Sequence, residues 1–501
     1  SGRWCWCRPW RVFCCPTLVT ARLPRRKSMT ADEARSEEMN MERTLGDASR
    51  SGLRQVDVTK LIDNSTRKSL PITVAVICFL AIVFDGLDSA LFGTVLPVLM
   101  KDMKMGPAEA GILASIGHIG AVGGAVLFGV AADSIGRKRM LLIGITVFTV
   151  FTAACGLSQG FIDFAIYRFI AGIGLAGIVP IAVALVFEYT PGKRKAVVSS
   201  ASYMGIGVGV LLSALLSIAF LSTAGWRAIL IGTFFCIVLV PVAFLWLPES
   251  MSILVKKRKK DSIRKILMRV DPRFISDVND EYVLNEPPAS KVPLKRLFQG
   301  GYARNTFFLG TALHCLMMIA VTLTTWVAHL MVQRGFTLAT GITFILVFSV
   351  SNFISTPLAG WMADRVGYKK VFAIYMPILF VSISLIGIVQ DPFAALICMF
   401  FAGFAVLGAT CLLLPYAGSL YPMSFRSSAM GVIYAIGRIG PIIGPAIAGV
   451  MLAAEMRVPL ILIFMAAPSI VALVAFLLVK DGPSQVVAQQ ETSLVTDPLH
   501  V

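Results

Sequence analysis

Twelve long apolar runs constrain what this chain can fold into more than any other feature of its sequence. A helix needs about 20 predominantly apolar residues to cross the ~30 Å hydrocarbon core of a bilayer. Because a spanning helix satisfies its own backbone polar groups in lipid, these runs predict an all-α membrane protein with 12 transmembrane helices. The runs lie at approximately 71–99, 108–132, 140–158, 161–188, 196–221, 226–247, 305–331, 338–362, 370–389, 392–420, 428–453 and 458–479.

The composition agrees with a membrane protein and excludes an ordinary soluble enzyme. Of the 501 residues, 56% are hydrophobic and 15% are charged, whereas about a quarter of a soluble domain is charged. The ten cysteines form no CxxC pair and the four histidines lack metal-ligand spacing, so no metal site is expected. The absence of a nucleotide-binding glycine-rich loop disfavours an ATP-driven process, and no cofactor is predicted.

One long polar stretch separates the first six spans from the last six. We therefore expect a six-helix half on each side of a cytoplasmic central loop, with a polar cytoplasmic tail at each end of the chain. The expected parts are the N-terminal tail 1–70, the N-terminal half 71–247, the central loop 248–304, the C-terminal half 305–479 and the C-terminal tail 480–501.

The first 28 residues have an unusual composition. Residues 1–28 contain seven bases and no acid, and they precede the first methionine, Met29. We interpret them as either an Arg-rich targeting leader or upstream sequence that is not part of the natural protein, and we favour the second interpretation.

The net charge of +17 is a topology signal. With a cytoplasmic N-terminus, the inside segments hold 38 Lys and Arg residues and the outside loops hold 5. This bias predicts a multi-pass protein of the cell (inner) membrane with both termini in the cytoplasm. The bases are concentrated in every second loop, on the expected cytoplasmic side, and do not form one continuous surface. Nucleic acid is therefore not an expected partner. For the run Lys256–Lys260, we favour a role as topology determinant over a contact with anionic lipid.

An internal repeat relates the two groups of spans. Residues 129–139 read GVAADSIGRKR and residues 360–370 read GWMADRVGYKK, and the same offset of 231 residues relates Tyr203 to Tyr434. Since 231 residues contain six helices and keep the same membrane orientation, the halves are predicted to be parallel repeats about an axis along the membrane normal. This arrangement predicts a central site between the halves.

These motifs resemble the major facilitator superfamily over roughly residues 70–480. Residues 129–139 look like the superfamily's loop between helices 2 and 3, which recurs here at 360–370. Within the superfamily the chain is most similar to the aromatic acid:proton symporters, and this implies a pseudo-symmetric transporter fold and an aromatic carboxylate substrate. The segments that carry the likeness are DGLD at 85–88, YRFIAGIGLAGIVP at 167–180, LPES at 247–250 and YPMSFRSSAMGVIYAIGRIGPIIGP at 421–445.

The two copies of the loop motif are predicted to act as gates. Asp133 and Asp364 stand at helix ends, where a carboxylate can interact with a helix N-terminus or an arginine in contacts that break on opening. Ser134 and Tyr368 depart from the family motif, which has basic residues at both positions. The predicted gating residues are Gly129, Asp133, Gly136, Arg137, Gly360, Asp364, Arg365 and Arg426.

Four charged residues lie well inside the predicted spans: Asp85, Asp88, Arg168 and Arg438. An unpaired charge at a helix centre is unfavourable by ~2.5–3.5 kcal/mol, so we expect the four to pair or to face water. Asp85 and Asp88 are three residues apart and share a helix face, where two close carboxylates can bind and release a proton. We predict that they couple transport to protons; the alternative is that they only pair with the arginines.

Arg438 is predicted to bind the substrate anion, because a guanidinium presents a planar fork to a carboxylate. Its counterpart in the repeat is Gly207, so the symmetry of the fold does not require it. Arg168 is expected to partner an aspartate at the same substrate site. The alternative for Arg438 is a helix–helix ion pair without a ligand. Three aromatic residues are candidates either for stacking on a substrate ring or for packing: Tyr434, Tyr203 and Trp326.

The charges in the spans sum to zero, so a bound carboxylate leaves −1 unless a proton accompanies it. We therefore predict a monomeric symporter, driven by the proton gradient, that imports an organic, aromatic carboxylate with H⁺ by alternating access. The alternatives are a sugar, polyol or other organic-solute carrier, and a non-transporting receptor on the same scaffold. For His118, His314 and His329, proton relay and simple hydrogen bonding both stay open.

Overall fold

A computed structural model describes residues 55–63, 69–191, 195–270, 274, 280–284, 297, 300–421 and 426–480. The chain divides into two units, one formed by Ser1–Gln55 with Asp277–Glu281 and the other by Val56–Ser276 with Tyr282–Val501. All of the helices that the structure describes lie in the second unit. The predicted leader at 1–28 lies outside the described residues.

The N-terminal group of helices follows the first six apolar runs. Two of these runs are interrupted: Gly177 separates α6 from α7, and a 3-10 segment joins α9 to α10. The elements are α3 (Ser69–Asp102), α4 (Pro107–Ile135), α5 (Arg137–Cys155), α6 (Phe161–Ala176), α7 (Ile178–Tyr189), α8 (Lys195–Phe220), α9 (Gly225–Gly232), η2 (Thr233–Val238) and α10 (Leu239–Trp246).

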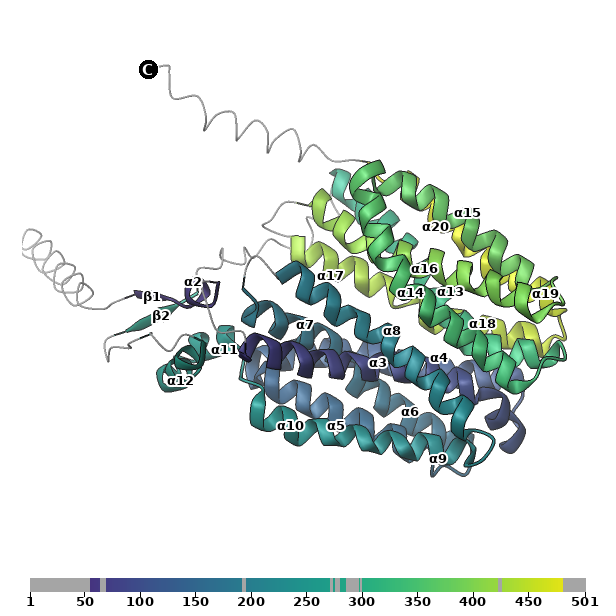
Figure 1. The fold of residues 1–501 in the computed structure, drawn as a ribbon, viewed down its shortest axis with the longest axis horizontal. Helices are drawn as coiled ribbons and strands as arrows, with labels where there is room; N and C mark the ends of the chain where they lie inside the picture. The colour runs from purple at the N-terminus through teal and green to yellow at the C-terminus, as the bar shows by residue number, and fades with distance from the viewer. Residues whose placement is uncertain are drawn as a thin grey trace, which may run out of the picture. The chain divides into compact units, whose positions relative to one another are not determined.

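The C-terminal group forms a second set of helices beside the first (Figure 1). Here Arg438 and Ile439 interrupt one run, and Ala467 interrupts the last. The elements are α13 (Gly300–Gln333), α14 (Leu338–Val366), α15 (Tyr368–Ile386), α16 (Pro392–Leu420), α17 (Arg426–Gly437), α18 (Gly440–Ala453), α19 (Val458–Ala466) and α20 (Pro468–Leu477).

Short elements gather at one end of the N-terminal group. They include α2 (Val58–Asp63), α11 (Met251–Lys256) and α12 (Lys260–Val270), and we call this end of the bundle the α11–α12 end (Figure 1). Strands β1 (Gln55–Asp57) and β2 (Glu281–Val283) form a two-stranded sheet.

Within the described chain, 11 stretches are long and apolar enough to cross a membrane. The remaining predicted run, 196–221, corresponds to α8, which contributes the shorter apolar helix Met204–Phe220. The all-α membrane architecture is therefore confirmed, with one of the 12 predicted spans represented only by this shorter helix.

The repeat is visible in the turns that join paired helices. Gly136 between α4 and α5 has φ +130°, and Gly367 between α14 and α15 has φ +90°. A side chain at either position would be strained, since L-residues rarely adopt positive φ. The packing repeats as well, because α4 contacts α6 just as α14 contacts α16. The two loop motifs thus form the same turn in each half.

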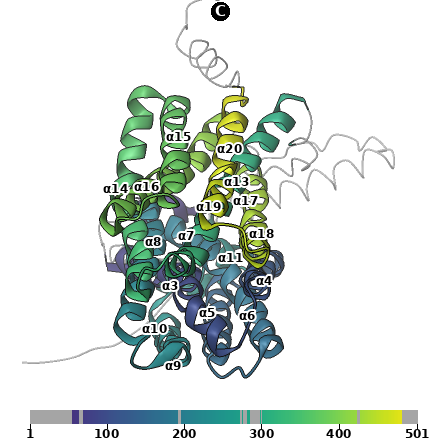
Figure 2. The ribbon, with the colours of Figure 1, turned by 90° about the vertical axis from the view of Figure 1, so that its right-hand side faces the viewer.

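The halves meet closely at the end of the bundle opposite the α11–α12 end. There α18 lies beside α4 in both views (Figures 1 and 2). A Cβ atom added at Gly111 would lie 2.6 Å from the carbonyl oxygen of Pro445 and 3.1 Å from the Cα atom of Gly449. Ser115 donates a hydrogen bond of 2.6 Å to the carbonyl oxygen of Ile442. Because Gly111 and Gly449 have no side chains, the backbones of the two halves can come into contact at this end.

Gly111→Leu should destabilise this interface, because the added side chain overlaps the backbone of α18. Overpacking of this kind typically costs ~1–3 kcal/mol, so we expect a lower Tm for the purified protein. Gly123→Leu on the same helix is the matched control, since no atom lies within 4 Å of a Cβ at that exposed position. Equal Tm values for the two variants would contradict the close packing of α4 on α18.

Candidate functional site

A buried ion pair joins α3 to α6. The Nη1 atom of Arg168 donates to Oδ1 of Asp88 at 2.5 Å, and the two side chains are only 8% and 9% exposed. Phe92, one turn after Asp88, has its ring centroid 5.5 Å from the guanidinium carbon. Pairing compensates two charges that would each be unfavourable alone in the membrane. Asp88 is thus the aspartate that Arg168 contacts.

Helix α4 lines the other side of this arginine. A Cβ at Gly117 would lie 3.1 Å from Nε of Arg168, so the glycine makes room for the guanidinium. This Nε is buried and has no hydrogen-bond partner among the described residues. His118, the next residue along, interacts electrostatically with both Arg168 and Arg438. His118 is thus linked electrostatically to one arginine of each half.

Asp85 connects the N-terminal half to Arg438. It lies one turn before Asp88 on α3, is half-buried, and interacts electrostatically with Arg438 and with Asp88. Arg438 stands at the interruption between α17 and α18, with Nη2 3.4 Å from the hydroxyl oxygen of Tyr434 and its guanidinium carbon 5.3 Å from that ring's centroid. A helix interruption inside a repeat is where transporter folds commonly place a ligand site.

These contacts gather the predicted membrane charges at one place between the halves. Asp88 and Arg168 form the ion pair, and both Asp85 and His118 interact electrostatically with Arg438. We call this group the central cluster: Asp85, Asp88, His118, Arg168 and Arg438.

Gly207, the repeat counterpart of Arg438, has different surroundings. A Cβ at Gly207 on α8 would lie 2.7 Å from Nδ2 of Asn352 on α14, and Ser349 of α14 donates to the carbonyl oxygen of Gly207 at 3.2 Å. Thr356 donates to Oδ1 of Asn352 at 2.7 Å and orients the carboxamide. A neutral contact between the halves therefore replaces a charged side chain at this position.

The aromatic candidates have different surroundings. Tyr434 lies beside Arg438, as described above. Trp326 is fully buried and donates from Nε1 to the carbonyl oxygen of Pro445 at 3.0 Å, which supports its alternative role in packing α13 against α18. Its ring also contacts His329, with centroids 5.7 Å apart. The side chain of Tyr203 lies outside the described part of the structure.

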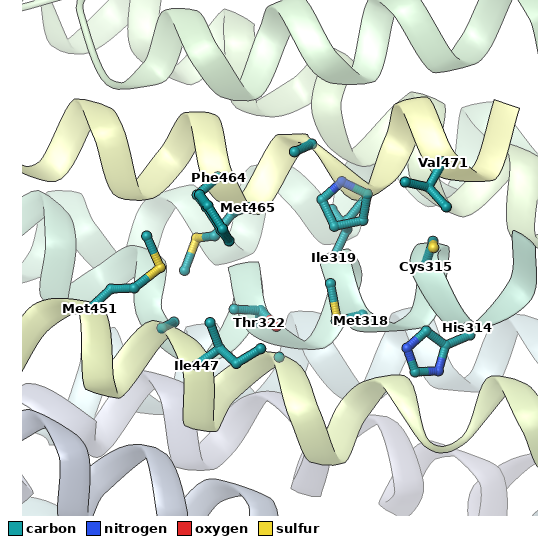
Figure 3. Close-up of a pocket in the computed structure, with 14 residues that line it drawn as sticks. His314, Cys315, Met318, Ile319, Thr322, Ile447, Met451, Phe464, Met465 and Val471 are labelled. Carbon is teal, nitrogen blue, oxygen red and sulfur yellow. The ribbon is translucent and has the colours of Figure 1, made fainter. Parts of the chain in front are cut away.

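A pocket of about 310 Å³ lies apart from the central cluster, in the C-terminal half (Figure 3). Side chains of α13, α18, α19 and α20 line it, including His314, Met318, Thr322, Ile447 and Phe464. None of its lining residues is an acid, a lysine or an arginine. The pocket therefore offers no lysine or arginine to an anionic ligand.

Arg137 in the first loop motif binds an acid that the sequence analysis did not single out. Its Nη1 donates to Oε1 of Glu188 at 2.6 Å. Glu188 also accepts from the hydroxyl groups of Ser250 and Ser252 and, at 3.0 Å, from the backbone N–H of Met251. This carboxylate therefore ties the start of α5 and the end of α7 to α11.

Glu249, in the LPES segment, holds the Gly136 turn. It accepts from the backbone N–H of Lys138 at 2.9 Å, and a Cβ at Gly136 would lie 2.5 Å from its Oε2. The Tyr189 hydroxyl donates to its carbonyl oxygen. Both Glu188 and Glu249 are acids at the ends of apolar runs, and this position is visible in the sequence. That both bind the start of α5, through Arg137 and Lys138, becomes apparent only in the structure.

The other predicted gating residues do not form a matching network within the described chain. Arg365 stacks on Trp361, with its guanidinium carbon 4.2 Å from the ring centroid, and Arg426 donates to the carbonyl oxygen of Tyr421 at 3.3 Å. Asp364 is exposed. No atom lies within 4 Å of a Cβ added at Gly129 or Gly360. The Asp133 side chain lies outside what the structure describes.

Comparison with known proteins agrees with this architecture. The family model described as Major Facilitator Superfamily matches residues 78–351 and 342–499. A benzoate transport protein of Acinetobacter baylyi is 29% identical over 85% of this chain and 93% of its own length, and a gallate transporter of Pseudomonas putida is 28% identical over 84% and 94%. The crystal structure of a D-xylose-proton symporter superposes with TM-score 0.65 at 17% identity, over 83% of this chain and 98% of that one.

The fold and its central cluster define a multi-pass membrane protein with two repeated halves around buried charges. The chain belongs to the Major Facilitator Superfamily, a family of transporters and not of enzymes.

Glu188→Ala should lower the stability of the α11–α12 end, because it leaves Arg137 without its counter-charge and several donors without their acceptor. Loss of one partner in such a group costs ~1–3 kcal/mol, so the Tm of the purified protein should fall. Asp261→Ala, which removes an exposed carboxylate from α12, is the control and should leave the Tm nearly unchanged. A wild-type Tm for Glu188→Ala would show that this network adds no stability.

Proposed function

We propose that this protein is a symporter that imports an aromatic carboxylate together with H⁺ by alternating access. The central cluster is the observation that carries the proposal, since it places two carboxylates and two guanidiniums between the halves. The relatives named for benzoate and gallate transport support the substrate class, because both compounds are benzene carboxylates. The positive-inside bias supports a cell (inner) membrane location with cytoplasmic termini, which makes the α11–α12 end the cytoplasmic end.

Within the cluster the two aspartates have different tasks. Asp88 is buried and committed to Arg168 at 2.5 Å, so it is the anchor that orients this arginine. Asp85 is only half-buried and belongs to the opposite half from Arg438, with which it interacts. Protonation of Asp85 would leave Arg438 without a counter-charge, and the substrate carboxylate would then take that place. Proton and substrate binding are thereby linked through one guanidinium.

The remaining members of the cluster complete the site. A third cation beside Arg168 and Arg438 would be repelled, so His118 serves as a neutral hydrogen-bonding group for the bound acid. The Tyr434 ring, next to Arg438, lies where it can stack on the substrate's ring. The close packing of the halves at Gly111, opposite the α11–α12 end, supports alternating access, since the other end is then free to open.

Uptake into proteoliposomes tests the proposed function. Labelled benzoate and gallate are offered with and without an imposed pH gradient, and D-xylose serves as the control solute. We expect the acids to accumulate only with the gradient and xylose not to accumulate. Binding without accumulation would indicate a receptor, and uptake of xylose would indicate a sugar carrier.

Asp85→Asn should abolish accumulation driven by the pH gradient while exchange of labelled for unlabelled acid continues, because a carboxamide keeps the shape but cannot release a proton. Asp88→Asn should abolish both activities, because it leaves buried Arg168 without a counter-charge. Both are measured in the same proteoliposomes. Gradient-driven accumulation by Asp85→Asn would remove this residue from the proton pathway.

Arg438→Lys should raise KM for the acid by about 10–100-fold, since lysine keeps the charge but loses the planar fork, and a charge-assisted hydrogen bond contributes ~1.5–3 kcal/mol. The matched control is Arg457→Lys, which changes an exposed arginine of the same half and should leave KM unaltered. An unchanged KM in Arg438→Lys would reject this arginine as the anion site.

A further inference from the structure

The surface of α11 and α12 carries a dense group of bases. Between residues 256 and 269 there are eight exposed basic side chains and one acid, Asp261. We call these bases the basic surface: Lys256, Lys257, Arg258, Lys259, Lys260, Arg264, Lys265 and Arg269.

The opposite side of α12 is already occupied by the protein itself. Ile263, Leu267 and Val270 are buried in the same hydrophobic cluster as Met251 and Leu254 of α11. The helix therefore does not offer its apolar side to a bilayer or to a partner helix. The exposed side of α12 is mainly basic, so a ligand that binds there is expected to carry negative charge.

The basic surface lies close to the membrane boundary. The last turn of α10 exposes Phe244, Leu245 and Trp246 by 63%, 69% and 59%, as expected for side chains that face lipid, and tryptophan favours the headgroup level. Helix α11 begins five residues later and its six residues extend ~9 Å. The bases thus begin within about one Debye length of the lipid headgroups.

Two lysines connect this region to the first loop motif. The Nζ atom of Lys257 donates to the carbonyl oxygen of Ser134 in the last turn of α4 at 2.5 Å. The Nζ atom of Lys138, just beyond the Gly136 turn, donates to the carbonyl oxygen of Phe244 at 2.7 Å. A ligand on the basic surface therefore sits beside the contacts that fix the α4–α5 turn.

We propose that the basic surface binds the phosphate headgroups of anionic membrane lipids and in doing so stabilises the α4–α5 turn. Charge complementarity selects the partner, because eight bases face a headgroup layer that carries negative charge. The positive-inside rule requires bases on this side, but it does not require them on one exposed side of a helix whose other side is packed in the core. The inference does not depend on which solute is transported.

Binding of lipid to the full-length protein in neutral detergent tests the proposal. Phosphatidylglycerol and phosphatidylcholine are titrated separately, and native mass spectrometry counts the bound molecules. We expect the wild type to bind phosphatidylglycerol at least tenfold more tightly, to lose most of this preference between 50 and 500 mM salt, and to gain Tm only with the anionic lipid. Free inorganic phosphate should not reproduce the gain in Tm.

The test variant replaces Lys256, Lys259, Lys260 and Arg264 with Gln and leaves Lys257 in place. The control replaces four other exposed bases, Lys101, Lys104, Lys370 and Arg457, with Gln and removes the same net charge. We expect the preference for phosphatidylglycerol to disappear in the test variant and to persist in the control. Equal loss in both, or no loss in either, would overturn the proposal.

If the test variant proves unstable in neutral detergent, the salt titration of the wild type decides, and a preference that survives 500 mM salt would overturn the proposal. Lipid binding is measured without substrate, so a failure of proton-driven uptake would leave this result standing, and a failure of lipid binding would leave the proposed transport standing.

Discussion

The ion pair of Asp88 and Arg168 is the interaction on which the centre of this molecule depends. Both side chains lie in a membrane-spanning region where an isolated charge is strongly unfavourable, and removal of one member of such a pair typically costs ~3–5 kcal/mol. The pair joins α3 to α6 within one half, so the proposed alternating access does not require it to break. The electrostatic interaction of Asp85 with Arg438 links residues of different halves, so in the proposed alternating-access mechanism it is the one that changes.

The contacts between the halves contrast with those inside each half. At Gly111 and Gly449 the halves meet through backbone atoms, without an ion pair at these positions. In lipid such contacts rely on dispersion, because apolar side chains are solvated equally well by acyl chains. The Glu188 network, by comparison, uses a charged acceptor within the N-terminal half. The Arg137–Glu188 ion pair thus lies within one half, whereas at Gly111 and Gly449 the halves meet by backbone packing.

Much of this arrangement was predictable from the sequence because it follows from local constraints. The length of the apolar runs predicts the spans, and the repeated motifs at 129–139 and 360–370 predict equivalent loops, in which Gly136 and Gly367 have positive φ. The partner of Arg137 was not predictable, since Glu188 is 51 residues away and competes with nearer acids. The position of Trp326 between α13 and α18 likewise depends on how two helices pack, which no local pattern specifies.

The repeat is asymmetric at the position of the proposed anion site, Arg438. If both halves carried an arginine at the position of Arg438, two guanidiniums would face each other and repel in a low-dielectric interior. Here Gly207 occupies the equivalent place, and the carboxamide of Asn352 fills the space that its missing side chain leaves. The backbone symmetry thus supplies two equivalent positions, of which one carries the Arg438 guanidinium and the other carries Gly207. In the proposed mechanism the two repeated halves move against each other, and the arginine that only one half carries binds the acid.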